Sequence, residues 1–407
     1  MSSMRRQLTG LILTGGGARA AYQVGVLSAI SEIRRDLGLR HAPNPFPIVC
    51  GTSAGAINGT ALACSADDFD LAVERLVQVW RNFHAEQVYE ADSLGVIRSG
   101  AKWLTMLSLG WLLTRWRKAR PKSLLDNAPL EQLLKRLVPL DRVPALMAQG
   151  HLHALAVSGS SYTSGQHVTF YECAANVLPW NRSQRIAVRD HITHQHLLAS
   201  SAIPFVFPAR ELMLAGQQEY FGDGSMRQAA PVSPAIHLGA DKVLVVGAGR
   251  LQETGHRQVA HQQDYPSLAQ IAGHTLSNIF LDALAVDIER LQRVNHTLRL
   301  LPEEARRHTP LRPVELLVIA PTQRLDDVAA KHIGALPGPI RTMLAALGVK
   351  ASAQSTSGAA LASYLLFEAD YTRELIDMGR SDTFARRGEV EAFFGWGQQA
   401  VAVRGAA

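Results

Sequence analysis

The stretch of sequence that decides the fold is residues 46–64, FPIVCGTSAGAINGTALAC. Residues 46–50 form a short apolar run that predicts a buried strand, and residues 54–64 are rich in small residues that favour a helix. Between them lies Gly51-Thr52-Ser53-Ala54-Gly55, a Gly-x-Ser-x-Gly motif. We therefore predict a strand, a sharp turn and a helix, with Ser53 projecting from the turn.

Ser53 is the candidate nucleophile of this turn. A serine hydroxyl reacts poorly until it is held exposed and its proton has an acceptor, and a strained strand-to-helix turn provides the exposure. Side chains at Gly51 and Gly55 would collide with the adjacent strand and helix, so both positions require glycine. The motif alone is common by chance, and its place between a strand and a helix is what favours a nucleophile over a packing turn.

The preceding unit of the chain repeats this arrangement. Residues 8–14 predict a strand, three glycines follow, and the next apolar helical face consists of Tyr22, Val26, Ile30, Ile33 and Leu37. In a parallel sheet the two turns open at the same edge. Because unobstructed amides can hold the negative oxygen of a tetrahedral intermediate, we assign Gly15, Gly16 and Gly17 to an oxyanion hole. Arg19 is expected to stabilise developing negative charge or to anchor a phosphate head group.

A competing interpretation of the same glycines is phosphate binding. The spacing of Gly15, Gly17 and Ala20 nearly matches a dinucleotide-binding motif, with alanine at the third glycine. However, no phosphate-binding Gly-Lys-Ser/Thr motif follows the first strand, and no acidic residue ends the second strand, where a ribose would be held. The sequence therefore disfavours nucleotide binding.

The rest of the chain alternates between predicted strands and helices. Further strands are predicted at residues 155–158, 168–172, 242–248 and 314–319, with helical stretches such as residues 268–294 between them. This alternation favours an α/β fold. The polar segment 252–263 predicts a surface loop, and the sequence beyond Pro321 is helical without a confident strand.

The proton acceptor for Ser53 is open to two interpretations. Histidine is the usual partner of a nucleophilic serine, and four histidines lie where a serine, acid, histidine order would place one: His237, His274, His296 and His332. The alternative is Asp223, which ends a short aromatic strand and precedes Gly224. Partial burial would raise the pKa of this carboxyl toward that of a useful base.

These motifs together resemble the patatin-like phospholipase family. Gly15 to Arg19, Gly51 to Gly55 and Asp223-Gly224 occur in the order and rough spacing of that family, over about residues 8–320. Three further segments are similar to family sequences, namely residues 125–130, 199–205 and 231–235. Two positions depart from the pattern: Ala20 replaces the last glycine of the first motif, and Ser225 follows Asp-Gly. Ser225 could hydrogen-bond Asp223 and lower its basicity.

The resemblance implies a fold, a mechanism and a substrate class. It implies a three-layer α/β/α fold with a mostly parallel central sheet, and a Ser53–Asp223 dyad without histidine. It also implies hydrolysis of acyl esters in phospholipids or related lipids, with no cofactor and no metal ion. We expect residues 1–320 to form the catalytic domain and residues 321–407 a helical C-terminal extension.

Composition limits the compartment and the partners of the protein. Cys50, Cys64 and Cys173 have no metal-binding spacing and form an odd set, which indicates a reducing compartment. No window approaches the roughly 18 continuous apolar residues that span a bilayer, so we expect a cytoplasmic protein. The formal net charge of +6 among 407 residues suits an anionic partner. Zinc-finger spacing, an RNA-binding aromatic motif and a recognition helix are all lacking, which disfavours nucleic acid.

One segment predicts contact with a membrane surface. Residues 103–114 are apolar, with tryptophans at 103 and 111, and a basic stretch ending at Lys122 follows at once. Such a segment suits an anionic lipid surface, and its alternative is a helix packed on the core with a solvated basic end. The sequence does not indicate an oligomeric state.

We therefore predict a serine acyl hydrolase of lipids at the inner face of a membrane. Two alternatives stay open: a catalytically weak lipid-binding regulatory protein of the same fold, and an esterase with a Ser-His-Asp triad. In ordinary α/β-hydrolases the nucleophile follows more strands, so Ser53 is early for the second alternative.

Overall fold

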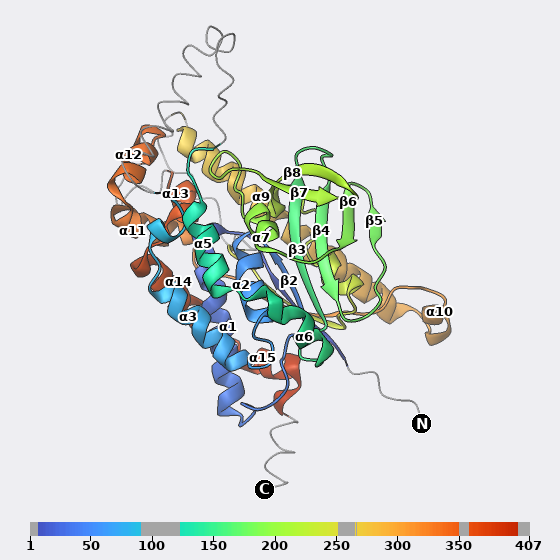
Figure 1. The fold of residues 1–407 in the computed structure, drawn as a ribbon. Helices are drawn as coiled ribbons and strands as arrows, with labels where there is room; N and C mark the ends of the chain where they lie inside the picture. The colour runs from blue at the N-terminus through green and yellow to red at the C-terminus, as the bar shows by residue number, and fades with distance from the viewer. Residues whose placement is uncertain (1–6, 91–122, 251–264, 266, 350–357, 398–407) are drawn as a thin grey trace.

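The computed structural model describes residues 7–90, 123–250, 265, 267–349 and 358–397 (Figure 1). One mixed sheet of ten strands runs through this part of the chain. The strands are β1 (Thr9–Leu13), β2 (Ile48–Thr52), β3 (Ala154–Ser161), β4 (His167–Cys173), β5 (Trp180–Arg182), β6 (Arg185–Arg189), β7 (Arg210–Leu214), β8 (Gln217–Asp223), β9 (Lys242–Val246) and β10 (Glu315–Ile319).

Helices flank this sheet along the chain (Figure 1). The longer ones are α1 (Ala21–Asp36), α2 (Ala54–Ala63), α3 (Phe69–Arg81), α5 (Ala128–Leu137), α9 (Leu268–Leu300), α12 (Gly338–Ala346) and α14 (Ala369–Ala385). The shorter ones are α6 (Val143–Ala148), α7 (His194–Ser200), α8 (Ser233–His237), α10 (Glu303–Arg307), α11 (Leu325–His332), α13 (Ala359–Leu365) and α15 (Arg387–Phe394). Short 3-10 turns include η1 (Gly17–Ala20) and η4 (Gly224–Arg227).

The sheet is mostly parallel, as predicted. Its strand order is β10-β9-β1-β2-β3-β4-β6-β5, with the β7–β8 hairpin joined to β3. The five strands from β10 to β3 are parallel, whereas β4 and β8 both run antiparallel to β3. The α/β fold with a mostly parallel central sheet is therefore confirmed.

Alternating side chains of the strands pack into separate cores on the two faces of the sheet. In β1, Leu11 and Leu13 face one core while Ile12 faces the other, as the period of two in a strand requires. The first core also contains residues of α1, α2, α3, α5 and α14, and the second contains residues of α8 and α9. The sheet thus forms the middle of three layers.

The predicted strands are present, with ends that shift by a few residues. The second strand runs from Ile48 to Thr52, so it includes Gly51 and Thr52 up to the residue before Ser53. The sequence analysis did not predict β5, β6 and β7. These strands lie toward an edge of the sheet and carry charged or exposed side chains, so they lack the continuous apolar run that marks β1 or β9.

The helical face predicted after the glycines is buried as expected. Tyr22, Val26, Ile30 and Ile33 in α1 have no exposed surface, and Leu37 lies just past the end of the helix. α14 crosses α1 with the two backbones in close contact. A Cβ atom on Gly25 would lie 2.1 Å from the carbonyl oxygen of Ile376, and one on Gly379 would lie 2.3 Å from that of Tyr22.

The described residues after residue 321 form helices, α11 to α15. Residues of these helices belong to the same hydrophobic core as β1 and α1, among them Leu325, Leu344 and Leu375. The division of the chain after residue 320 stays a prediction. The surface loop predicted at residues 252–263 and the segment 103–122, predicted to contact a membrane, lie outside the described residues.

By length and composition alone, α9 qualifies as a helix that could cross a membrane. A third of its most apolar window of 18 residues is buried in the fold. Helices in the cores of water-soluble proteins meet the same criterion. The property therefore does not distinguish between a buried and a membrane-spanning helix.

We predict that Gly25→Ala destabilises the protein by roughly 2 kcal/mol or more, because a methyl group at this position overlaps the backbone of α14. The denaturation midpoint in urea measures this change. Gly388→Ala in α15 is the matched control, since nothing lies within 4 Å of a Cβ atom there. It is expected to leave stability unchanged or slightly increased. Equal stabilities of the two variants would contradict the close crossing of α1 and α14.

Candidate active site

Ser53 lies in a strained turn between β2 and α2. Its backbone has φ +56° and ψ −132°, a conformation that side-chain-bearing residues rarely adopt. A Cβ atom on Gly51 would lie 2.4 Å from the Cα atom of Ala56, and one on Gly55 would lie 2.3 Å from the carbonyl oxygen of Leu13. Both glycines are thus required for the turn to pack between its strand and its helix, as the sequence indicated.

The register of three strands brings Asp223 next to Ser53. Thr52 of β2 pairs with Ser158 of β3, and the next residue of β3, Gly159, pairs with Asp223 of β8. Ser53 and Asp223 therefore meet across the end of β3. The Ser53 hydroxyl donates a hydrogen bond to Oδ2 of Asp223 at 2.6 Å.

Gly224 allows β8 to end this close to the nucleophile. A Cβ atom on Gly224 would lie 2.2 Å from the carbonyl oxygen of Ser158 and 2.9 Å from the Thr52 side chain. Any larger residue would therefore push Asp223 away from Ser53. The Asp-Gly pair is a requirement of the site and not only a turn signal.

Asp223 is a buried carboxyl with a raised pKa. The residue has no exposed surface. Burial raises the pKa of Asp223 to about 6, although hydrogen bonds from Ser53 and Ser225 act in the opposite direction. The bond from Ser225 is donated by its main-chain N–H to Oδ1 at 2.9 Å. A glycine or alanine at position 225 would supply the same main-chain bond but would lack the Ser225 side chain, which also lowers the pKa of Asp223.

A second serine, which the sequence analysis did not single out, contacts the nucleophile turn. The main-chain N–H of Ser53 donates to Oγ of Ser200 at 2.9 Å, and Ser200 is fully buried at the end of α7. The following loop is tied to the acid, because the Asp223 N–H donates to the carbonyl of Ala202 at 3.0 Å. The family-like segment 199–205 was the only sequence signal for this contact.

The glycine turn after β1 lies beside the nucleophile turn. β1 and β2 are parallel neighbours in which Leu13 pairs with Gly51, so the residues after them share one edge of the sheet. Gly17 has φ +54°, and it lines the same cavity as Ser53. Among the described residues, the hydrogen bonds include none donated by the amides of Gly15, Gly16 or Gly17. The oxyanion hole at these three glycines stays a prediction.

Arg19 does not face the cavity, contrary to the expectation of a substrate contact. Its side chain is 3% exposed and forms an ion pair with Asp326 at 2.5 Å. Its Nε donates to Oγ of Ser363 at 2.7 Å, and its guanidinium lies 4.1 Å from the centre of the Tyr364 ring. These contacts occupy the guanidinium, so we correct its role to a structural one.

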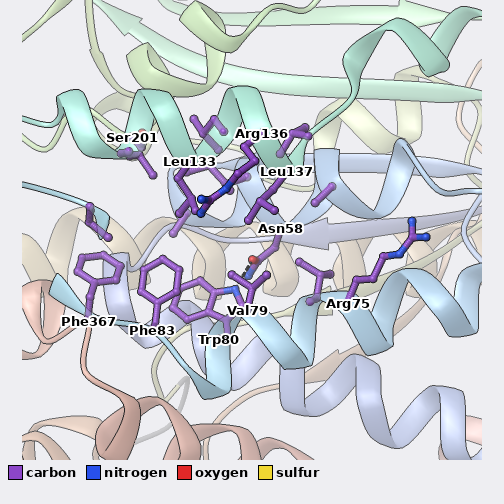
Figure 2. A pocket seen from close by; sticks show the side chains of 18 of the residues that line it. Asn58, Arg75, Val79, Trp80, Phe83, Leu133, Arg136, Leu137, Ser201 and Phe367 are labelled. Atoms are coloured by element: carbon purple, nitrogen blue, oxygen red, sulfur yellow. Dashed lines mark hydrogen bonds between the residues drawn. The ribbon is translucent and has the colours of Figure 1, made fainter. Parts of the chain in front are cut away.

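An apolar cavity of about 680 Å³, which Ser53 helps to line, lies between α2, α3 and α5 (Figure 2). Ile57 and Ala61, four residues apart on one face of α2, line it, as do Ser53 and Ser65 just outside the two ends of this helix. Figure 2 shows Phe367, Phe83 and Trp80 side by side at one end and Arg75 at the other.

Two of the four candidate histidines make other contacts. His237 is stacked on Trp180, with ring centroids 4.7 Å apart, and His332 pairs with Glu374 at 2.6 Å. In the described part of the chain, the side chains of Ser53 and Asp223 are hydrogen-bonded to each other, and Asp223 also accepts from the main-chain N–H of Ser225, so no histidine is among their partners. Nor do the described residues contain three or more His, Cys, Asp or Glu side chains grouped to hold a metal ion.

A family model and a curated relative match parts of this chain. The model described as patatin-like phospholipase matches residues 11–236, more than half of the chain. The lysophospholipase nte1 of Aspergillus terreus is 47% identical over 58 residues, which cover 14% of this chain and only 3% of the fungal protein. The match thus concerns a short segment of both proteins.

Solved structures with similarity include VipD from Legionella pneumophila and the type III effector ExoU. VipD has 14% identity and a TM-score of 0.30, with 92% of this chain and 67% of VipD covered. ExoU has 16% identity and a TM-score of 0.28, with 88% and 77% covered. ExoU in complex with SpcU, from Pseudomonas aeruginosa, has 15% identity and a TM-score of 0.26, with 74% and 57% covered.

We predict that Asp223→Asn stabilises the fold at neutral pH. A carboxyl whose pKa is raised by burial stabilises the folded state only while protonated, so wild-type stability falls as pH rises from about 4 through 6. Asparagine avoids this loss, so its advantage grows to ~2–3 kcal/mol above about pH 7. Urea unfolding of both proteins across this pH range measures the difference. A difference that is independent of pH would contradict the raised pKa.

Proposed function

Because this chain belongs to the patatin-like phospholipase family, we propose that it hydrolyses acyl esters of lipids, with Ser53 as nucleophile and Asp223 as general base. One observation carries the proposal. The Ser53 hydroxyl donates to the Asp223 carboxyl at 2.6 Å, and Ser53 lines a large apolar cavity. Nucleophile, base and space for an acyl chain therefore occur in one place.

The first half of the reaction forms an acyl-enzyme. Oγ of Ser53 attacks the ester carbonyl carbon while Oδ2 of Asp223 accepts its proton. The carbonyl oxygen becomes negative, and the free amides of Gly15, Gly16 and Gly17 hold it. The bond between the carbonyl carbon and the alcohol oxygen then breaks, and Asp223 returns its proton to the departing alcohol.

The second half releases the fatty acid. A water molecule attacks the Ser53 ester and Asp223 accepts the water proton. When the bond from the carbonyl carbon to Oγ breaks, Asp223 returns that proton to Ser53. A pKa of about 6 suits a group with both roles, because it is mostly ionised at neutral pH and still donates readily once protonated.

The cavity indicates that the acyl group is long. Ala54 and Ala61 of α2 both line the cavity and lie seven residues apart, so with a rise of about 1.5 Å per residue this helical part of the wall is roughly 10 Å long. A fully extended chain advances about 1.2 Å per bond, so an unbranched chain of about eight bonds fits along this part of α2 alone, and the cavity continues along α3 and α5 to a volume of about 680 Å³. We therefore propose single-chain or phospholipid esters of long fatty acids as substrates.

The proposed place of action rests on the sequence alone. We propose a cytoplasmic protein that acts at an anionic membrane surface, with residues 103–122 as the contact. The lipid-binding regulatory protein stays the second candidate. In such a protein Ser53 and Asp223 would be present without hydrolysing a lipid ester.

We predict that Ser53→Ala and Asp223→Asn each lower kcat/KM by roughly 10³-fold or more, because each removes one half of the proton transfer. Fatty-acid release from phosphatidylcholine and lysophosphatidylcholine vesicles measures the effect. His237→Ala and His332→Ala are the controls and are expected to retain activity. A histidine variant as inactive as Ser53→Ala would favour a triad. Inactive wild type would favour the regulatory protein.

We also predict that Ala61→Phe changes the preference for chain length. A phenyl ring two helical turns from Ser53 occupies the middle of the cavity, so turnover of long acyl esters falls at least 10-fold more than turnover of butyrate esters. Nitrophenyl esters of increasing chain length measure the profile. Ala305→Phe, at an exposed position of α10, is the matched control. An unchanged profile in Ala61→Phe would mean that the acyl chain binds elsewhere.

A further inference from the structure

α13, in the C-terminal part of the chain, packs directly on the glycine turn, which consists of Gly15, Gly16 and Gly17. Residues 17 and 364 are far apart in sequence, yet a Cβ atom on Gly17 would lie only 2.3 Å from the main-chain oxygen of Tyr364. The contact is therefore backbone against backbone, between the turn and α13. It limits how far the end of the turn can move away from Ser53.

Arg19, two residues after the turn, extends this contact through its side chain. Its guanidinium pairs with Asp326 of α11 and donates to Oγ of Ser363 and to the carbonyl of Ala360 in α13. The Ser363 hydroxyl donates to the carbonyl oxygen of Ala360, with 2.6 Å between the two oxygen atoms. Its own oxygen can therefore accept the hydrogen bond from Arg19. Charge-assisted bonds of a buried guanidinium are strong and directional. We call Arg19, Asp326 and Ser363 the arginine clamp.

The start of the glycine turn is held independently by the central fold. The carbonyl of Thr14 accepts from Nε2 of Gln23 at 2.7 Å, and its hydroxyl accepts from the N–H of Ala248 at 3.1 Å. The three glycines therefore run between two anchors. The first anchor belongs to the sheet and α1, and the second is the arginine clamp.

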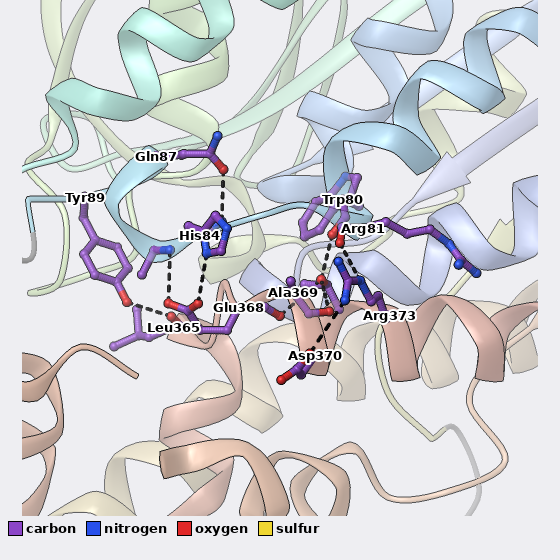
Figure 3. A network of polar contacts seen from close by, with 12 residues as sticks. Trp80, Arg81, His84, Gln87, Tyr89, Leu365, Glu368, Ala369, Asp370 and Arg373 are labelled. Atoms are coloured by element: carbon purple, nitrogen blue, oxygen red, sulfur yellow. Dashed lines mark hydrogen bonds and ion pairs between the residues drawn. The ribbon is translucent and has the colours of Figure 1, made fainter. Parts of the chain in front are cut away.

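The same C-terminal segment also holds one wall of the cavity (Figure 3). The Tyr89 hydroxyl donates to the carbonyl of Leu365 at 2.8 Å, and Thr372 donates to the carbonyl of Trp80 at 2.7 Å. Between them Phe367 lines the cavity, with its ring centroid 5.7 Å from that of Phe83. The C-terminal segment is thus held both by Arg19 and by these contacts with the cavity wall.

We propose that the arginine clamp positions the amides of the glycine turn for oxyanion binding. The proposal rests on the proposed function of Gly15, Gly16 and Gly17. Three consecutive glycines are conformationally free, and an oxyanion hole works only when its donors are fixed before the reaction. Displacement of such groups by about 1 Å costs on the order of 100-fold in rate. The residues matched by the family model end at 236, so Asp326 and Ser363, the partners of Arg19 in the clamp, lie outside that match.

Asp326→Asn tests this role because it keeps the shape of the side chain and removes its charge. We expect kcat for lysophosphatidylcholine to fall at least 10-fold while KM changes less than 2-fold, since the amides act on the transition state. Asp327→Asn is the matched control, because the neighbouring Asp327 is exposed and forms no ion pair among the described residues. Ser363→Ala, which removes one neutral bond, is expected to give a smaller loss of kcat.

Hydrogen exchange gives a readout that does not depend on turnover. In Asp326→Asn and Ser363→Ala, amides of a peptide covering residues 10–22 are expected to exchange faster, while those of β9 keep the wild-type rate. If the wild-type protein has no esterase activity, the proposed function is wrong. The exchange rates would still show whether the clamp fixes the glycine turn.

Three results would overturn the proposal. The first is unchanged exchange of residues 10–22 in both variants. The second is faster exchange throughout the fold in both variants, which would mean a general loss of stability. The third is a rise in KM at constant kcat, which would return Arg19 to a role in substrate binding.

Discussion

The register of β3 between β2 and β8 is the constraint on which the site depends. Ser158 pairs with Thr52, and Gly159 pairs with Asp223, so a single strand sets the separation of the Ser53 hydroxyl from its acceptor. A slip of one residue would move every side chain of a strand to the opposite face. The cores on both faces of the sheet prevent such a slip, which is why packing far from Ser53 maintains its hydrogen bond to Asp223.

Close approach of backbones is the second constraint, and it explains where glycine is needed. Gly51, Gly55 and Gly224 each face a backbone or side-chain atom that a Cβ atom would overlap. At Gly17 the same argument applies to α13, with a positive φ in addition. Close main-chain contacts therefore fix the backbone of the site, and this backbone sets the positions of the Ser53 and Asp223 side chains.

Burial of Asp223 connects the chemistry to stability. Removal of the carboxyl from water raises its pKa toward neutrality, which suits proton transfer at neutral pH. The same burial makes the ionised form unfavourable in the folded state, so the site reduces the stability of the fold that supports it. The shared core of β1, α1 and the C-terminal helices offsets this cost, because these elements bury large side chains such as Tyr22, Tyr364 and Tyr371.

The sequence by itself determined the local units of this protein. Residues 8–20 and 46–64 predicted two strand–turn–helix units, and the family resemblance named Asp223 over four histidines as the partner of Ser53. Those predictions depend on turn chemistry and periodicity, which are local properties. Only the tertiary structure decided the contact of Ser200 with Ser53, the burial of Arg19 against Asp326 and the placement of the C-terminal helices on the glycine turn. Each of these joins residues more than 100 positions apart, and no local pattern specifies which distant partner a side chain meets.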